Sequence, residues 1–323
     1  MASIARSPRS LSRQGIWGSN FIDRIFRSST LLLALSIPVL MIALLVILSV
    51  MSAPSIHYSG WRFLTASIWD AVHSHYGILF AIYGTLVSSL LALLFAIPIS
   101  LGAAICLSEL APRWLRNPVS FLIELLAAVP SIVYGLWGIF VLVPFLRVVE
   151  TWLGERLGYI PLFQGSVTGY GMLTAGMILA IMILPYITSV SREVLTAVPS
   201  EQREAAYALG ATRWEALRGP VLRYARSGIM GAIILGLGRA LGETMAVTMV
   251  IGNRAEISSS LFSPGYTLPS LLANEFVEAS DHLQTASLVE AALILVVITL
   301  IINSIARLMI WKAVKAGQTE ARA

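Results

Sequence analysis

Long uninterrupted apolar stretches, rather than alternating apolar and polar positions, dominate the pattern along this chain. The first covers residues 31–51, contains no charged side chain and, at about 1.5 Å of helical rise per residue, is long enough to cross a hydrocarbon core of about 30 Å. Further stretches cover residues 78–107, 118–146, 172–190, 228–252 and 283–306. The pattern predicts an all-α integral membrane protein with six transmembrane helices.

Basic residues are distributed unequally between the loops on the two sides of these stretches. Of the 22 Lys and Arg residues, seventeen fall in the two tails and the loops on the same side as the tails, four fall on the other side, and Arg239 lies inside an apolar stretch. Because Lys and Arg next to membrane spans favour the cytoplasm, we expect both termini to be cytoplasmic.

Composition agrees with a lipid bilayer as the surroundings. Hydrophobic residues make up 57% of the 323 residues and charged residues 12%, against about 25% charged in soluble domains. Membrane topology accounts for the net charge of +5, so we expect no nucleic-acid partner. Cys106 is the only cysteine, so the chain cannot form an intrachain disulfide. The four histidines lack helical i,i+4 spacing, so we expect no metal site.

The chain lacks a motif for binding ATP. A phosphate-binding loop ends in Gly-Lys-Ser or Gly-Lys-Thr, whereas the two lysines, Lys312 and Lys315, follow Trp311 and Val314. If ATP drives this protein, a separate chain hydrolyses it, so we expect no catalytic residue and no cofactor here. Residues 253–282 form the longest extracytoplasmic segment and are too few to bury a core, so substrate capture also requires a partner.

The loop between the fourth and fifth stretches predicts two short helices that meet at a bend. Ser200 is placed to cap the first helix, and Gly210 permits a left-handed turn after it. Thr212 and Glu215 have the spacing of a capping box that opens the second helix, and Gly219–Pro220 is expected to stop it. Such an exposed bend is typical of a docking element for a partner protein.

Three segments in this order resemble one family of transport proteins. The loop resembles the EAA motif of ABC-importer permeases, and residues 127–138 and 237–247 resemble the corresponding parts of PstC-type permeases from phosphate importers. The resemblance covers roughly residues 78–311. The residues that match the EAA motif are Glu204, Ala205, Ala206 and Gly210. The resemblance implies that their helix inserts into a cleft of the ATPase subunit.

The resemblance implies a type I ABC importer permease fold and an assembly in the bacterial inner membrane. The implied partners are a second homologous permease (PstA type), an ATPase homodimer (PstB type) that binds ATP–Mg, and an extracytoplasmic phosphate-binding protein (PstS type). We divide the chain into a cytoplasmic tail (1–28), a first helix with its extracytoplasmic loop (29–77), the permease domain (78–311) and a C-terminal tail (312–323).

Arg239 and Glu243 are two ionisable residues four apart within the fifth stretch, which predicts that they share one helical face. Gly231, Gly238 and Gly242 form a strip beside them where another helix is expected to pack closely. In one interpretation the two charges neutralise each other and fix helix packing. In the other, Glu243 holds Arg239 at rest and releases it to bind passing phosphate, whose oxygens suit the planar guanidinium.

Pro130 lies within the third stretch and is expected to kink that helix and free the carbonyl of Leu126. Ser131 and Tyr134 follow it, and we place all three beside the substrate pathway, although the kink also has a purely structural interpretation.

Two other functions remain open from the sequence. A proton-coupled secondary transporter would use Glu124, Glu243 and Glu290 as a proton relay and would need no ATPase. An ABC permease for another oxyanion, sulfate or molybdate, would keep the same architecture. A role in sensing phosphate status is neither indicated nor excluded.

Overall fold

The structure is a computed structural model that describes residues 16–320. The first fifteen residues of the expected N-terminal tail and the last three of the C-terminal tail lie outside the described residues. By its internal contacts the chain divides into two units, residues 1–50 and 51–323. Of the first unit, residues 16–50 are described and helical, and the side chains described in residues 21 and 23–50 are mostly apolar and exposed.

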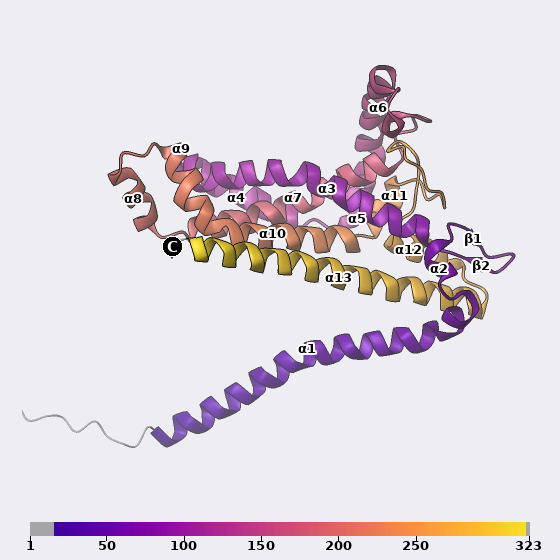
Figure 1. The fold of residues 1–323 in the computed structure, drawn as a ribbon, viewed down its shortest axis with the longest axis horizontal. Coiled ribbons are helices and arrows are strands. Elements are labelled where there is room, and N and C mark those ends of the chain that lie inside the picture. The colour runs from indigo at the N-terminus through magenta and orange to yellow at the C-terminus, as the bar shows by residue number, and fades with distance from the viewer. Residues whose placement is uncertain (1–15, 321–323) are drawn as a thin grey trace, which may run out of the picture. The chain divides into compact units, whose positions relative to one another are not determined.

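Helices account for most of the described residues (Figure 1). The α-helices are α1 Ile16–Ser59, α2 Arg62–Thr65, α3 Leu79–Ile105, α4 Arg113–Ala127, α5 Ser131–Trp137, α6 Val143–Leu157, α7 Met172–Thr196, α8 Ser200–Ala208, α9 Arg213–Ala216, α10 Leu222–Gly242, α11 Met245–Val250, α12 Leu268–Glu278 and α13 His282–Glu320. Short π-helical or 3₁₀ segments are η2 Cys106–Leu110, η3 Gly138–Leu142, η4 Pro161–Phe163 and η5 Leu217–Val221.

A small hairpin follows α2. Strands β1 (Trp69–Asp70) and β2 (His75–Tyr76) pair antiparallel, with Trp69 opposite Tyr76. The Asp70 carboxylate stabilises the turn by accepting hydrogen bonds from the backbone amides of Val72 and His73 at 2.9 and 3.2 Å. A further hydrogen bond with the His73 ring is the main cause of the lowered pKa of Asp70.

Six helical stretches of the described residues are long and apolar enough to cross a membrane, which confirms the expected number. They are Asp23–Ser59, Leu79–Leu110, Ser131–Leu157, Met172–Thr196, Arg213–Gly242 and His282–Trp311. The third differs from the predicted residues 118–146. The helix that was expected to kink at Pro130 instead breaks there, because α4 ends at Ala127 and Pro130, with extended backbone (ψ 140°), caps α5.

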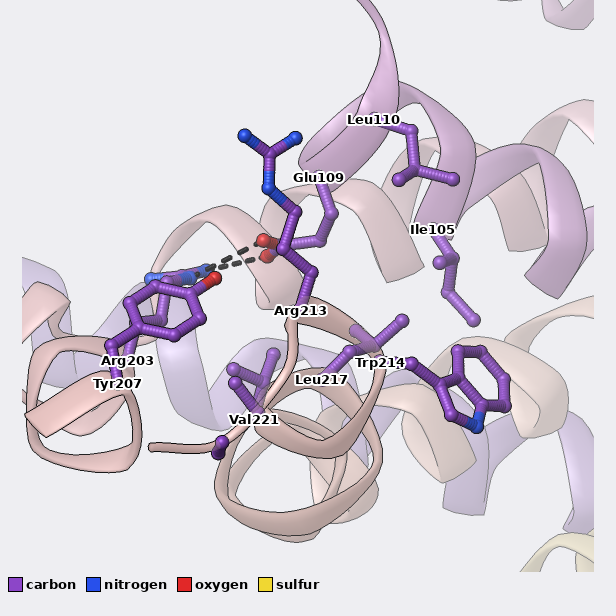
Figure 2. Close-up of a pocket in the computed structure, with 11 residues that line it drawn as sticks. Ile105, Glu109, Leu110, Arg203, Tyr207, Arg213, Trp214, Leu217 and Val221 are labelled. Atoms are coloured by element: carbon purple, nitrogen blue, oxygen red, sulfur yellow. Dashed lines mark hydrogen bonds and ion pairs between the residues drawn. The ribbon is translucent and has the colours of Figure 1, made fainter. Parts of the chain in front are cut away.

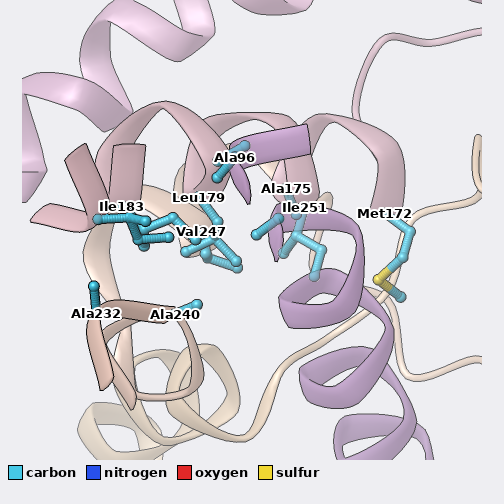
Figure 3. Packing of buried hydrophobic residues seen from close by; sticks show 12 residues of the cluster. Ala96, Met172, Ala175, Leu179, Ile183, Ala232, Ala240, Val247 and Ile251 are labelled. Carbon is cyan, nitrogen blue, oxygen red and sulfur yellow. The ribbon is translucent and has the colours of Figure 1, made fainter. Parts of the chain in front are cut away.

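Helix α7 packs against both α3 and α10 and forms the centre of the second unit. Leu179 and Ile183 of α7 meet Ala96 of α3 and small residues of α10, among them Ala232 (Figure 3). These positions are fully or almost fully buried, so small and large side chains alternate across the helix contacts.

The glycines that allow close approach of α10 to α7 differ from the strip predicted by the sequence. A Cβ at Gly228 would lie 2.5 Å from Val194, and one at Gly236 would lie 2.8 Å from Ile187. Of the predicted strip, only Gly238 faces another helix, with a Cβ there 3.8 Å from the Asn303 amide of α13. No atom lies within 4 Å of a Cβ built at the other two predicted positions, Gly231 and Gly242.

Candidate functional site

The loop between α7 and α10 forms an exposed elbow, which we define as residues 199–216. Helix α8 has no buried residue, and Gly210 after it has a φ of +83°, as a left-handed turn requires. The predicted capping box is present, because Thr212 accepts a hydrogen bond from the Glu215 amide and Glu215 accepts one from the Thr212 amide at 2.8 Å. The predicted cap at Ser200 is wrong, since Ser200 is the first helical residue and its hydroxyl caps nothing.

Gly219–Pro220 does not stop the second short helix. The π-helical segment η5 continues from α9 directly into α10, so residues 213–242 form one continuous helix. A π turn accommodates proline because its wider spacing interrupts the regular hydrogen-bond ladder that the proline ring would otherwise break. Movement of the elbow is therefore linked mechanically to α10.

Arg203 of α8 connects the elbow to two membrane helices (Figure 2). Its guanidinium pairs with both oxygens of Glu109 in η2, at 2.7 and 3.4 Å. It also donates to the carbonyls of Val198 and Leu195 at the end of α7, at 2.7 and 3.0 Å. Through these hydrogen bonds the Arg203 side chain holds α8 against the ends of α3 and α7. Arg203, Glu109 and Trp214 line a cavity of about 710 Å³.

Two tyrosine hydroxyls satisfy backbone carbonyls at the break before Pro130. Tyr134 of α5 donates to the Leu126 carbonyl at 2.8 Å, which is the carbonyl that the proline was expected to free. Tyr186 of α7 donates to the Ala127 carbonyl at 2.7 Å. A break of this kind inside a membrane needs such partners, because unpaired backbone groups cost several kcal/mol in lipid.

Arg239 lies over the ring of Tyr186. Its Cζ is 4.5 Å from the ring centroid. The Nε of Arg239 is buried and has no hydrogen-bond partner among the described residues. Tyr186 thus connects Arg239 to the break before Pro130. Tyr134 satisfies the other carbonyl of that break, with Pro130 and Ser131 at the start of α5.

Glu243 caps the C-terminus of α10 and, among the described residues, makes no ion pair with Arg239. Helix α10 ends at Gly242, and the ψ of 125° at Glu243 directs the following backbone out of the helix. Glu243 is 8% exposed and accepts a hydrogen bond from the Ala246 amide at 3.4 Å. Within residues 16–320 no ion pair joins it to Arg239, so neither the self-neutralising pair nor the resting-state clamp describes this conformation.

A groove of about 900 Å³ lies between α7, α10 and α13. Tyr186, Gly238 and Arg239 line it from α7 and α10, and Asn303 and Arg307 line it from α13. The Oδ1 of Asn303 is buried and, like Arg239 Nε, has no hydrogen-bond partner in the described part of the chain. The groove therefore combines positive charge with polar groups that are free to bind a ligand.

The other membrane carboxylates have local partners. Glu124 pairs with Arg192 at 3.3 Å, and Glu290 of α13 accepts a hydrogen bond from Ser55 at 2.5 Å. Glu150, which the sequence analysis did not single out, is fully buried in α6 and accepts from the Gly169 amide at 3.0 Å. Each lies apart from the groove lining, and the described residues contain no group of three His, Cys, Asp or Glu side chains that could hold a metal ion.

Sequence reasoning missed Tyr186, Arg203 and Asn303. Two signals were available, because a tyrosine follows Pro185 in mid-span and an asparagine interrupts the apolar run of the last span. Arg203 looked like one of many cytoplasmic arginines, and its pairing with Glu109, 94 residues away, appears only in the fold.

Known proteins have sequences similar to that of this chain. Residues 96–310 match the family described as "Binding-protein-dependent transport system inner membrane component". The chain is 46% identical over 301 residues to the phosphate transport system permease protein PstC of Haemophilus influenzae, covering 92% of this chain and 95% of that protein. It is 48% identical over 295 residues to the protein of that name from Mesorhizobium japonicum, covering 90% of each.

Solved structures with similar folds are ABC transporters. A chain of an inward-facing MetNI methionine ABC transporter superposes with a TM-score of 0.56 at 19% identity, covering 73% of this chain and 95% of that one. A chain of a bacterial ABC transporter involved in the import of alginate superposes with a TM-score of 0.59 at 15% identity, covering 90% and 98%.

Proposed function

The chain belongs to the family of binding-protein-dependent transport system inner membrane components, and from this premise we propose that it is the permease subunit of an ATP-driven phosphate importer. It is a multi-pass membrane protein with the type I ABC importer permease fold. The phosphate permeases to which it is 46–48% identical along most of its length support the substrate.

The observation that carries the proposal is the unpaired Arg239 in the groove. An arginine costs about 2.5 to 3.5 kcal/mol at the centre of a membrane helix, and no carboxylate among residues 16–320 forms an ion pair with this one. The ring of Tyr186 supports the cation and leaves its donors free. A phosphate that enters the groove would meet a planar guanidinium able to form two parallel hydrogen bonds.

Energy would come from a partner. Under this proposal an ATPase homodimer binds ATP–Mg and grips the elbow at Glu204, Ala205, Ala206 and Gly210. A second homologous permease would complete the pore, and an extracytoplasmic phosphate-binding protein would deliver the substrate. Both termini would then lie in the cytoplasm, with the complex in the bacterial inner membrane.

Coupling would run through two connections at the elbow. Closure of the ATPase subunits moves α8, Arg203 carries that movement to the ends of α3 and α7, and the continuous helix of residues 213–242 carries it to Arg239. ATP can drive this change only if the ATP-bound state favours the outward-facing conformation in interaction energy. The chain itself contributes motion and a path for the anion.

A proton relay has less support. Glu124, Glu243 and Glu290 each have a separate local partner, and no hydrogen bond between any two of them occurs in the described range. Proton transfer between them would need connections that this conformation lacks. Uptake driven by a proton gradient without any ATPase subunit would favour the relay.

The deciding experiment is purification of the chain with its neighbouring subunits, followed by measurement of ATPase activity. We expect a co-purifying nucleotide-binding chain and ATP hydrolysis that rises when phosphate and its binding protein are added. Stimulation by sulfate or molybdate instead would reassign the substrate. Phosphate transport by the isolated chain without ATP would contradict the proposal.

A further inference from the structure

Two buried polar atoms that have no hydrogen-bond partner among the described residues belong to side chains that line the same groove, one on α10 and one on α13. Arg239 on α10 contributes an N–H donor, and Asn303 on α13 contributes a carbonyl acceptor. The Asn303 amide lies beside Gly238, the residue before Arg239, since a Cβ built at Gly238 would lie 3.8 Å from Nδ2 and 3.9 Å from Oδ1 of Asn303. Since buried polar groups without partners cost free energy, a donor and an acceptor left free in one groove indicate a ligand that supplies both complements.

Phosphate supplies both. Near neutral pH it retains at least one O–H group, so it donates one hydrogen bond and accepts several, whereas sulfate has lost its protons and only accepts. A guanidinium binds the oxygens of either anion, but a carbonyl acceptor binds only the protonated one. A site built to receive a hydroxyl group discriminates strongly against an analogue that lacks it, because the acceptor is then left unpaired.

We propose that Asn303 is the specificity-determining residue of the groove, and that its Oδ1 accepts the O–H of phosphate while Arg239 binds the other oxygens. The inference rests on the proposed function and adds to it the basis on which protonated oxyanions are selected over sulfate. It requires no residue of the second permease to make the distinction.

The rest of the groove fits passage of an anion after recognition. Arg307 lies four residues beyond Asn303 on α13, about 6 Å along the helix, and also lines the groove. Ser304 adds a hydroxyl beside it. An anion that leaves Arg239 and Asn303 therefore meets a second cation one helical turn away, so release does not strand it in an apolar environment.

The test compares anion binding by the assembled permease–ATPase complex without its extracytoplasmic binding protein. Labelled inorganic phosphate is bound to the complex and displaced with unlabelled phosphate or sulfate. In the wild type we expect phosphate to displace at much lower concentration than sulfate. In Asn303→Leu, which keeps the size of the side chain and removes the acceptor, we expect phosphate affinity to fall about tenfold or more with sulfate affinity unchanged.

Two further variants separate recognition from structure. Asn303→Asp keeps an acceptor at this position and should keep the preference for phosphate, whereas Thr299→Val removes a hydroxyl from the same helix outside the groove lining and should change neither affinity. Equal losses for both anions in Asn303→Leu, loss of the preference in Asn303→Asp, or no specific phosphate binding by a complex that imports phosphate would each overturn the inference. A wild-type complex that does not import phosphate would instead refute the proposed function.

Discussion

The guanidinium of Arg239 lies over the ring of Tyr186, with 4.5 Å between Cζ and the ring centroid, and the hydroxyl of that tyrosine donates to the Ala127 carbonyl. The Tyr186 side chain therefore stabilises the cation in the groove and satisfies a backbone carbonyl at the helix break before Pro130. The position of Arg239 is thereby connected to the junction between α4 and α5, which lies far from it in sequence.

Substitutions at Tyr186 should separate these two roles. Tyr186→Phe keeps the ring beneath Arg239 but leaves the Ala127 carbonyl unpaired, so we expect a loss of about 1 to 3 kcal/mol of stability with phosphate uptake largely retained. Tyr186→Leu also removes the cation–π contact and should reduce uptake further. Thermal unfolding of the purified complex and uptake into proteoliposomes measure the two effects; identical behaviour of both variants would contradict the division.

Arg239 should tolerate no neutral substitution. We expect Arg239→Gln to abolish phosphate uptake while membrane insertion and co-purification with the partner subunits stay normal. Arg239→Lys keeps the charge but lacks the planar fork, so uptake should fall at least tenfold without disappearing. Normal uptake by the glutamine variant would remove Arg239 from the pathway.

Arg203 should matter for coupling rather than for assembly. Arg203→Lys cannot pair with both Glu109 oxygens and with the carbonyls of Leu195 and Val198, so we expect ATP hydrolysis to continue while the phosphate transported per ATP falls severalfold. Glu109→Gln removes only the ion pair and should show a smaller loss. An unchanged ratio of transport to hydrolysis in the lysine variant would argue against this connection.

The bend at Gly210 depends on its left-handed backbone. A Cβ there would meet no atom within 4 Å, so Gly210→Ala should cost only the conformational penalty of about 1 to 2 kcal/mol. Gly210→Asn should cost less, because asparagine adopts this conformation more readily. Affinity between the complex and its ATPase subunit is the measurement, and equal affinities for alanine and asparagine variants would show that backbone conformation does not limit docking.

Two glycines of α3 offer a matched test of packing. A Cβ at Gly84 would overlap the backbone carbonyl of Tyr266, whereas one at Gly102 would meet no atom within 4 Å. We expect Gly84→Ala to destabilise the protein by several kcal/mol and Gly102→Ala to be neutral or to stabilise it by up to about 1 kcal/mol. Thermal unfolding in detergent compares them, and similar midpoints would contradict the close approach at Gly84.

The sequence was sufficient for the number of spans, the bend of the elbow and the presence of an arginine within a span, although it paired that arginine with Glu243. Each depends on local information: apolar length, the capping pair of Thr212 and Glu215, and the cost of burying Arg239. The breaks were harder to place. The residues on both sides of Pro130 are apolar, so hydropathy cannot distinguish one kinked helix from two helices. Around Glu243 the residue pattern predicts a continuing helix, whereas α10 ends at Gly242.

The tertiary partners of the site were beyond local reasoning. Tyr186 reaches Ala127 across 59 residues, and Asn303 faces α10 only because α13 returns alongside it. Within this chain the close contacts with α7 are made by Gly228 and Gly236, whereas Gly231 and Gly242 of the predicted strip face open space. Helical spacing identifies a face of small residues, but it does not say which face another helix will cover.

Leu209 directly follows α8 within the elbow and has 90% of its surface exposed, and Tyr207 and Trp214 of the same elbow are also exposed. Large exposed apolar side chains of this kind promote association with other proteins when no partner covers them. Under the proposed function an ATPase covers this surface. A copy of the subunit made in excess of that ATPase would expose these side chains to chaperones and proteases, so the amount of the subunit in a cell would follow the supply of the ATPase rather than the rate of its own synthesis.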